Sequence, residues 1–142
     1  MKRLCMICFL MVMICIPVIY THAMPIIENE PCGKSATFTM DENGVLIVSG
    51  KGEVNVGHGC PQEKMNKTKK IIIQEGITSI AHYGLPGKDV TEISLPNSLN
   101  KIGEAILSFY PKLKKIELPK ALIFLPKDTF ENSIADFLYD ID

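Results

Sequence analysis

Histidine and cysteine are scarce in this chain, which has three histidines and five cysteines among its 142 residues. Beyond residue 23 only His58, His82, Cys32 and Cys60 remain. A zinc site needs three or four ligands, and a thiol nucleophile needs a free, activated Cys60 beside a base. His58-Gly59-Cys60 with His82 could be imagined as either kind of site. These few histidines and cysteines are a weak basis for a zinc site or for a thiol nucleophile. We therefore expect no enzyme, no metal and no cofactor.

An excess of positive charge is also lacking. The chain has 15 Lys and Arg against 16 Asp and Glu, a formal net charge of −1, and the balance falls to −3 when residues 1–23 are left out. Nucleic-acid binding depends on basic residues clustered on one face, so we expect no nucleic-acid partner. The one dense basic run is Lys64–Lys70. We interpret it as a solvated linker, with a polyanion site as the alternative.

Long hydrophobic runs are absent after the N-terminus. Two basic residues precede the apolar run Leu4–Ile19, and Thr21-His22-Ala23 offers the small residues that signal peptidase reads. This pattern predicts a signal peptide over residues 1–23, a mature start at Met24 and a secreted protein. A signal anchor is the alternative, although the run is short for a span of about 20 residues. Residues 137–142 form a short acidic tail, so we expect no membrane span after signal removal.

The cysteine count changes when the signal peptide is removed. Only Cys32 and Cys60 remain, which is an even number in a secreted chain. We expect a disulfide between them, with two free thiols as the alternative. The bridge would close a loop of about 29 residues and, on a chain-entropy model, stabilise the fold by about 3–4 kcal/mol.

Three stretches of the chain are copies of one another, namely Thr68–Lys88, Val90–Tyr110 and Leu113–Ser133. The copies are spaced by 22 and then 23 residues, a period that is typical of solenoids. Each copy must bury its apolar edge against the next. The aligned apolar columns are Ile71, Ile93 and Ile116; Ile73, Leu95 and Leu118; Ile77, Leu99 and Leu122; Ile80, Ile102 and Leu125; and Leu85, Leu107 and Phe130.

The local pattern within the copies predicts short strands. Val90-x-x-Ile93-x-Leu95 has the L-x-x-L-x-L form of a leucine-rich repeat, and Leu113-x-x-Ile116-x-Leu118 repeats it. Proline follows each run and ends the strand, because it has no amide proton for a ladder. We expect a second strand after each proline, at Ile77–Ile80, Leu99–Ile102 and Leu122–Leu125, and then a helical turn at about Glu104–Tyr110 and Lys127–Glu131.

A β-hairpin is expected upstream of the repeats. Ala36–Met40 and Val45–Ser49 are strand-like runs, and Asp41-Glu42-Asn43-Gly44 between them suits a tight turn. We expect Gly50-Lys51-Gly52 to relax the chain into a loop. We interpret residues 24–67 as an N-terminal capping hairpin region, followed by three leucine-rich repeats at residues 68–136, because the end of a solenoid needs a polar cover.

Several of these segments resemble the BspA-like leucine-rich-repeat proteins. The run Ile93–Ala105 is similar to their repeat unit, Glu75–Ile80 resembles the segment that opens their first repeat, and Cys32–Phe38 with Asn43–Gly52 resembles their N-terminal cap. The chain departs from the family in having no tryptophan and in lacking the usual small-aromatic pair near the end of the repeats. The resemblance implies a mostly β solenoid of about three coils with short helical turns, and a role in adhesion to host or matrix proteins.

The outward positions of the first strands are the candidate binding site. They form one column of Lys70, Glu92 and Lys115 and a second column of Ile72, Ser94 and Glu117. Opposite charges beside each other stabilise a sheet by about 0.2–1 kcal/mol per pair, so this face is either a solvated charge ladder or a partner-binding surface. Asn66-Lys67-Thr68 is a glycosylation sequon that matters only in a eukaryotic secretory pathway.

The pattern as a whole predicts a secreted or cell-surface leucine-rich-repeat protein that binds another protein. A secreted inhibitor or decoy that blocks one partner is the alternative, since three repeats are few for an adhesin.

Overall fold

The structure is a computed structural model that describes residues 25–56, 62–81, 85–126 and 128–130. The expected signal peptide, His58, Cys60, His82 and the acidic tail lie outside the described residues. The elements are β1 (Pro25–Pro31), β2 (Ser35–Asp41), β3 (Val45–Val54), α1 (Gln62–Met65), β4 (Lys70–Ile73), β5 (Ile77–Ile80), β6 (Glu92–Ser94), β7 (Lys101–Ile102) and β8 (Lys115–Glu117).

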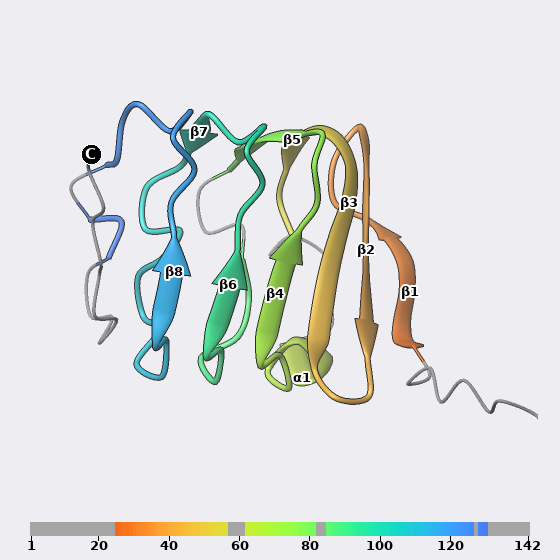
Figure 1. Ribbon diagram of the computed structural model, residues 1–142. Helices are drawn as coiled ribbons and strands as arrows, with labels where there is room; N and C mark the ends of the chain where they lie inside the picture. The colour runs from red at the N-terminus through yellow and green to blue at the C-terminus, as the bar shows by residue number, and fades with distance from the viewer. Residues whose placement is uncertain (1–24, 57–61, 82–84, 127, 131–142) are drawn as a thin grey trace, which may run out of the picture.

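Six of the strands lie side by side in the order β1-β2-β3-β4-β6-β8. The first three pair antiparallel, whereas β3, β4, β6 and β8 run parallel to one another (Figure 1). Ile71 of β4 pairs with Ile93 of β6, which pairs with Ile116 of β8. The 22- and 23-residue period therefore predicts the strand register correctly.

Strand β3 takes part in two parallel ladders of strands. Its first half pairs with β4, from Val45 opposite Lys70 to Val48 opposite Ile73, and its second half pairs with β5. Between the halves Gly50 and Gly52 have φ angles of 115° and 85°, which only glycine adopts readily. The expected loop at Gly50–Gly52 is thus wrong, because these glycines turn the strand through a corner and leave it in the ladder up to Val54.

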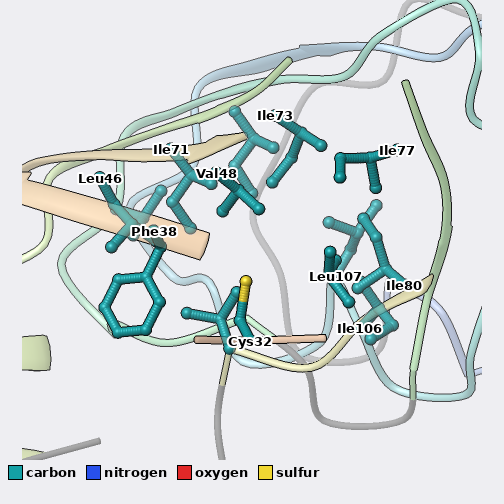
Figure 2. Packing of buried hydrophobic residues seen from close by; sticks show 14 of the residues in the cluster. Cys32, Phe38, Leu46, Val48, Ile71, Ile73, Ile77, Ile80, Ile106 and Leu107 are labelled. Carbon is teal, nitrogen blue, oxygen red and sulfur yellow. The ribbon is translucent and has the colours of Figure 1, made fainter. Parts of the chain in front are cut away.

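The core lies between the two parallel ladders, one containing β4 and the other containing β5. Ile71 and Ile73 of β4 and Ile77 and Ile80 of β5 are at most 3% exposed. Phe38 and Leu46 of the β2–β3 hairpin belong to the same cluster, as Figure 2 shows. Hairpin and repeats therefore share one continuous core.

The β2–β3 hairpin turns where the Asn-Gly pair predicts. The amide of Gly44 donates to the carbonyl of Asp41, and Asp41 Oδ1 accepts hydrogen bonds from the amides of Asn43 and Val45. Strand β1, which pairs with β2 and forms the edge of the sheet, was not expected from the sequence. Its residues have no clear alternation of apolar and polar types.

Two local expectations in the repeats are wrong. Residues 104–109 form turns rather than a helical turn, because Ala105 and Phe109 have φ angles of 54° and 64°, outside the right-handed helical region. The second strand is present in the first repeat as β5, shortened to two residues in the second as β7, and absent at Leu122–Leu125. A two-residue β7 offers little ladder for a further strand. Of the turn expected at residues 127–131, the structure describes only residues 128–130, which form a turn.

The linker Lys64–Lys70 is only partly solvated. Lys64, Lys67 and Lys69 are exposed, as expected, but Met65 and Thr68 are buried in the core. Buried and basic residues interleave here because the chain passes from the single helical turn of α1 to β4 through residues 66–69 alone.

Candidate functional site

The outward positions of the parallel strands lie in the two expected columns. Lys70 pairs in register with Glu92, which pairs with Lys115, and Ile72 pairs with Ser94, which pairs with Glu117. In each strand the residue between the two outward positions is a buried isoleucine. The alternation of a strand thus presents these six positions on one face of the sheet. We call this set the strand face.

The first column contains an ion pair. Lys70 Nζ lies 2.7 Å from Glu92 Oε1, and the two side chains are 37% and 55% exposed. An exposed pair of this kind contributes at most about 1 kcal/mol to stability. Its more important effect is to hold two long side chains in one geometry across neighbouring strands.

The strand face continues onto the hairpin, which the sequence did not lead us to expect. Val45 pairs with Lys70 and Ile47 with Ile72 in parallel register, and Thr39 of β2 pairs with Ile47. Ile47 and Ile72 are both half-buried. The alternation along β3 indicates that Val45, Ile47 and Ser49 share one face of that strand. Only the parallel pairing of β3 with β4, a long-range contact, shows that this face is continuous with the strand face.

A groove of about 410 Å³ runs along the strand face at β6 and β8. Its polar lining comes from Thr91, Glu92, Ser94, Lys114 and Glu117. Carboxylates, hydroxyls and an amine at one groove can hydrogen-bond a polar segment of another protein.

A carboxylate orders the corner that follows β4. Glu75 Oε1 and Oε2 accept hydrogen bonds from the amides of Asn97 and Ser98, at 2.8 and 3.1 Å. The Ser98 hydroxyl donates to the carbonyl of Ile77 and accepts from the amide of Gly76. The hydrogen bond from the Asn97 amide, with help from Ser98, lowers the pKa of Glu75 below its ordinary value of 4.5. This corner therefore joins the first and second repeats through side chains as well as through the ladder.

A second ion pair joins the turns that precede β6 and β8. Lys112 Nζ lies 2.6 Å from Asp89 Oδ1, and its hydrogen bond and charge lower the pKa of Asp89. Nearby, the hydroxyl of Tyr110 donates to the carbonyl of Leu85, and burial raises the pKa of the tyrosine. Polar side-chain contacts thus join the first and second repeats after their strands, and also join the segments that precede β6 and β8.

The remaining candidate residues lie apart from the strand face. Cys32 is buried beside the β2–β3 hairpin at 6% exposure, and Cys60 is outside the described residues, so the bridge stays a prediction. Asn66 is exposed, whereas Thr68 of the same sequon is fully buried and its hydroxyl lies 3.3 Å from Met40 Sδ. A glycan on Asn66 would thus have to be added before Thr68 is buried.

The described ranges also bear on metal binding and on membrane crossing. In them no three His, Cys, Asp or Glu side chains gather as metal ligands would. Within the same ranges no helix has the length and apolar character that crossing a bilayer requires.

Comparison with known proteins agrees with this geometry. A family model described as a BspA type leucine-rich repeat region of six copies matches residues 62–138. No curated protein matches the chain. Among solved structures, the chain is similar to a leucine-rich repeat protein from Eubacterium ventriosum, with a TM-score of 0.53 and 17% identity. The similarity covers 73% of this chain and 35% of that one, so the chain spans about a third of the other protein's length.

Proposed function

Because the chain belongs to the BspA-type leucine-rich-repeat family, we propose that it binds another protein through the strand face. The observation that carries the proposal is the register of the six outward positions on β4, β6 and β8. Side chains on paired strands are held in fixed positions, and rigid elements give a binding surface precise geometry. The extended strand face is also the surface that repeat proteins use for partners.

The composition of the strand face supports a protein partner. The strand face and its continuation on the hairpin meet at the half-buried pair Ile47 and Ile72, and beside this pair lie Ser94 and the ion pair of Lys70 with Glu92. An apolar centre with a polar rim is the usual arrangement of a protein interface.

We propose further that the protein is secreted and acts at or near a cell surface in adhesion. The basic start, apolar run and small residues of positions 1–23 support secretion. An inhibitor or decoy that blocks one partner is the second candidate, and the short strands favour it, because β6 and β8 have only three residues each. Catalysis has no part in the proposal, since the scarcity of histidine and cysteine favours binding.

The architecture that we propose for this function is a solenoid of three coils with the β2–β3 hairpin as its cap. The three-membered columns of Ile71, Ile93 and Ile116 support the number of coils. The parallel pairing of β3 with β4 supports the cap, because it places the hairpin against the first repeat strand. An oxidised Cys32–Cys60 bridge would stabilise this cap, and the unreduced protein would then be lighter than the dithiol by two hydrogens and inert to alkylating reagent.

The experiment that tests the function is a pull-down from culture medium and from cell surfaces with the mature protein, followed by affinity measurement on the identified partner. Glu92→Lys should weaken that affinity at least several-fold, while the melting temperature changes little, because Glu92 is exposed. Glu63→Lys is a matched control, since Glu63 is an exposed glutamate of α1 outside the strand face. Equal affinities of the two variants and the wild type would refute the strand face as the binding surface.

Fractionation of the producing cells separates the two candidate roles. Adhesion requires that the protein stay with the cell surface, whereas an inhibitor or decoy should accumulate in the medium. A protein that remains inside the cell would contradict both.

A further inference from the structure

Exposed lysines gather at the end of the sheet where the parallel strands begin. The turns that lead into β4, β6 and β8 lie together at this end, beside α1 (Figure 1). Their exposed lysines are Lys67 and Lys69 before β4, Lys88 before β6, and Lys112 and Lys114 before β8. We call these five residues the basic edge. The dense basic run of the sequence supplies only two of them, and the fold brings the other three from later repeats.

Backbone hydrogen bonds hold the basic edge in a row along the direction in which the repeats stack. The amide of Thr91 donates to the carbonyl of Lys69 at 2.8 Å, and the amide of Lys114 donates to the carbonyl of Thr91 at 3.2 Å. The three residues therefore occupy the same position in successive repeats. Because neighbouring strands are about 4.8 Å apart, the backbones of Lys69 and Lys114 are about 10 Å apart. The row thus crosses all three repeats.

One carboxylate lies among these amines. Lys112 Nζ is 2.6 Å from Asp89 Oδ1. This lysine chiefly, and Lys88 and Lys69 through their charges, lower the pKa of Asp89. Three lysines from three different turns therefore act on a single acidic group. Five lysines against one aspartate leave a formal charge of +4 on the basic edge, although the chain beyond residue 23 carries −3 in all.

Further acidic residues border the basic edge. The turn between β2 and β3 carries Asp41 and Glu42. This turn adjoins the first repeat, where the carbonyl of Gly44 accepts a hydrogen bond from the amide of Lys69. On the strand face, Glu92 is held by Lys70. The cationic row therefore extends from Lys69 towards β8, away from the hairpin.

The basic edge has amines without the anchoring groups of other binding surfaces. Residues 64–70, 88–91 and 112–114 include no aromatic residue, and none of the large exposed hydrophobic residues of the described chain belongs to them. Single-stranded nucleic acid is held by bases stacked on aromatic side chains, a membrane surface by apolar side chains, and a protein partner by an apolar centre. A lysine ammonium is a flexible point charge that pairs with an anion without such anchors. This chemistry favours a polymer whose charges are carried on a polar backbone.

We propose that the basic edge binds a linear anionic polysaccharide, whose sulfate or carboxylate groups lie along the row from Lys69 to Lys114. This site is separate from the protein-binding role proposed above. The two sites adjoin at Lys114, which also lines the groove of the strand face. A polysaccharide at the basic edge would hold a secreted protein on a cell surface or matrix and leave the strand face to its protein partner.

Charge removal away from the strand face tests the site in the mature protein. The probes are fluorescently labelled oligosaccharides of heparin, which carries sulfates, and of hyaluronan, which carries carboxylates. The test variant is Lys69→Gln with Lys88→Gln. The matched control is Lys101→Gln with Lys120→Gln, which removes the same charge from exposed lysines outside the basic edge. Fluorescence anisotropy measures affinity, and thermal melts measure folding. The single variants Lys88→Gln and Lys101→Gln give the same comparison if the double variant is less stable.

At least one of the two probes should bind the wild type, with an affinity that falls by about tenfold or more between 50 and 200 mM salt. The test variant should lose about fivefold or more in affinity and the control less than about twofold, since only the test variant removes cations from the row. Equal affinities of the two variants, or no binding of either probe, would overturn the proposal. Tighter binding of an oligothymidylate, a polyglutamate peptide or phosphatidylserine vesicles than of both probes would overturn the assignment to a polysaccharide. No protein partner is used, so failure here is distinct from failure of the proposed function.

Discussion

The hairpin end and the C-terminal end of the described chain use similar residues to opposite effect. Phe38 on β2 is fully buried, whereas Phe124, in the last repeat, is 73% exposed. Both residues lie in segments that the sequence predicts as strands. Phe38 lies on the inward face of β2, which is paired on both sides by β1 and β3, whereas Phe124 lies between the inward columns of Leu122 and Leu125, where no strand forms. Burial in this repeat protein therefore depends on the position in the strand and on its neighbours, and residue type alone does not decide it.

Truncation of the two phenylalanines should give the largest contrast. Phe38→Ala should lower the free energy of unfolding by about 3–5 kcal/mol, because it leaves a cavity in a closed core. Phe124→Ala should change it by less than about 0.5 kcal/mol, as expected for an exposed side chain. Urea denaturation followed by circular dichroism measures both. A loss above about 2 kcal/mol for Phe124→Ala would mean that the C-terminal end is covered by a further segment or a partner.

A pair of glycines tests how tightly the hairpin end is packed. A Cβ added to Gly50 would lie 2.2 Å from the carbonyl oxygen of Ser35, whereas one added to Gly52 would meet no atom within 4 Å. Both glycines have positive φ angles. Gly52→Ala should therefore cost only backbone strain, about 1 kcal/mol, and Gly50→Ala should cost about 2–3 kcal/mol. Equal losses in thermal melts would show that the corner of β3 adapts and that the close approach is unimportant.

The carboxylate of Glu75 distinguishes the junction between the first and second repeats from the junction between the second and third. The lowered pKa means that the ionised carboxylate stabilises the fold. This contribution is present above the ordinary value of 4.5 and is lost as the pH falls through the lower folded pKa. The aligned position of the second repeat is Asn97, which cannot titrate. Stability of the wild type should thus fall more steeply below pH 4.5 than that of Glu75→Gln.

Chemical denaturation between pH 3 and 6 measures this slope. Glu42→Gln is the matched control, because it removes an exposed carboxylate from the turn between β2 and β3. Identical slopes for the wild type and Glu75→Gln would show that the hydrogen bonds of Glu75 do not persist in solution.

The smallest effect is expected for the ion pair of the strand face. Glu92→Gln should lower the free energy of unfolding by less than about 1 kcal/mol, since both partners are more than a third exposed and are screened by salt. The loss should shrink further in 1 M sodium chloride. A loss larger than that of Gly52→Ala would mean that the strand face has a structural role beyond that of a solvated charge ladder.

The sequence predicted the repeated strands and their faces well. The spacing of Ile71, Ile93 and Ile116 predicted their register, and the Asn43-Gly44 pair predicted the hairpin turn. It predicted the connections poorly, since residues 104–109 form turns with two left-handed residues and β3 continues through Gly50. The candidate face was predicted at its repeat positions and missed at Thr39 and Ile47, which join it only through the β3–β4 pairing.

By itself the sequence determined which residues alternate between core and surface, because a strand presents successive side chains on opposite faces whatever its neighbours are. It also determined the repeat period, and with it the order in which repeat strands stack. Only the tertiary structure decided that the hairpin shares the core of the repeats and extends their strand face, and that no strand forms at Leu122–Leu125. The physical reason is that burial and strand pairing are made by segments distant in the chain, and local sequence does not specify which of them meet.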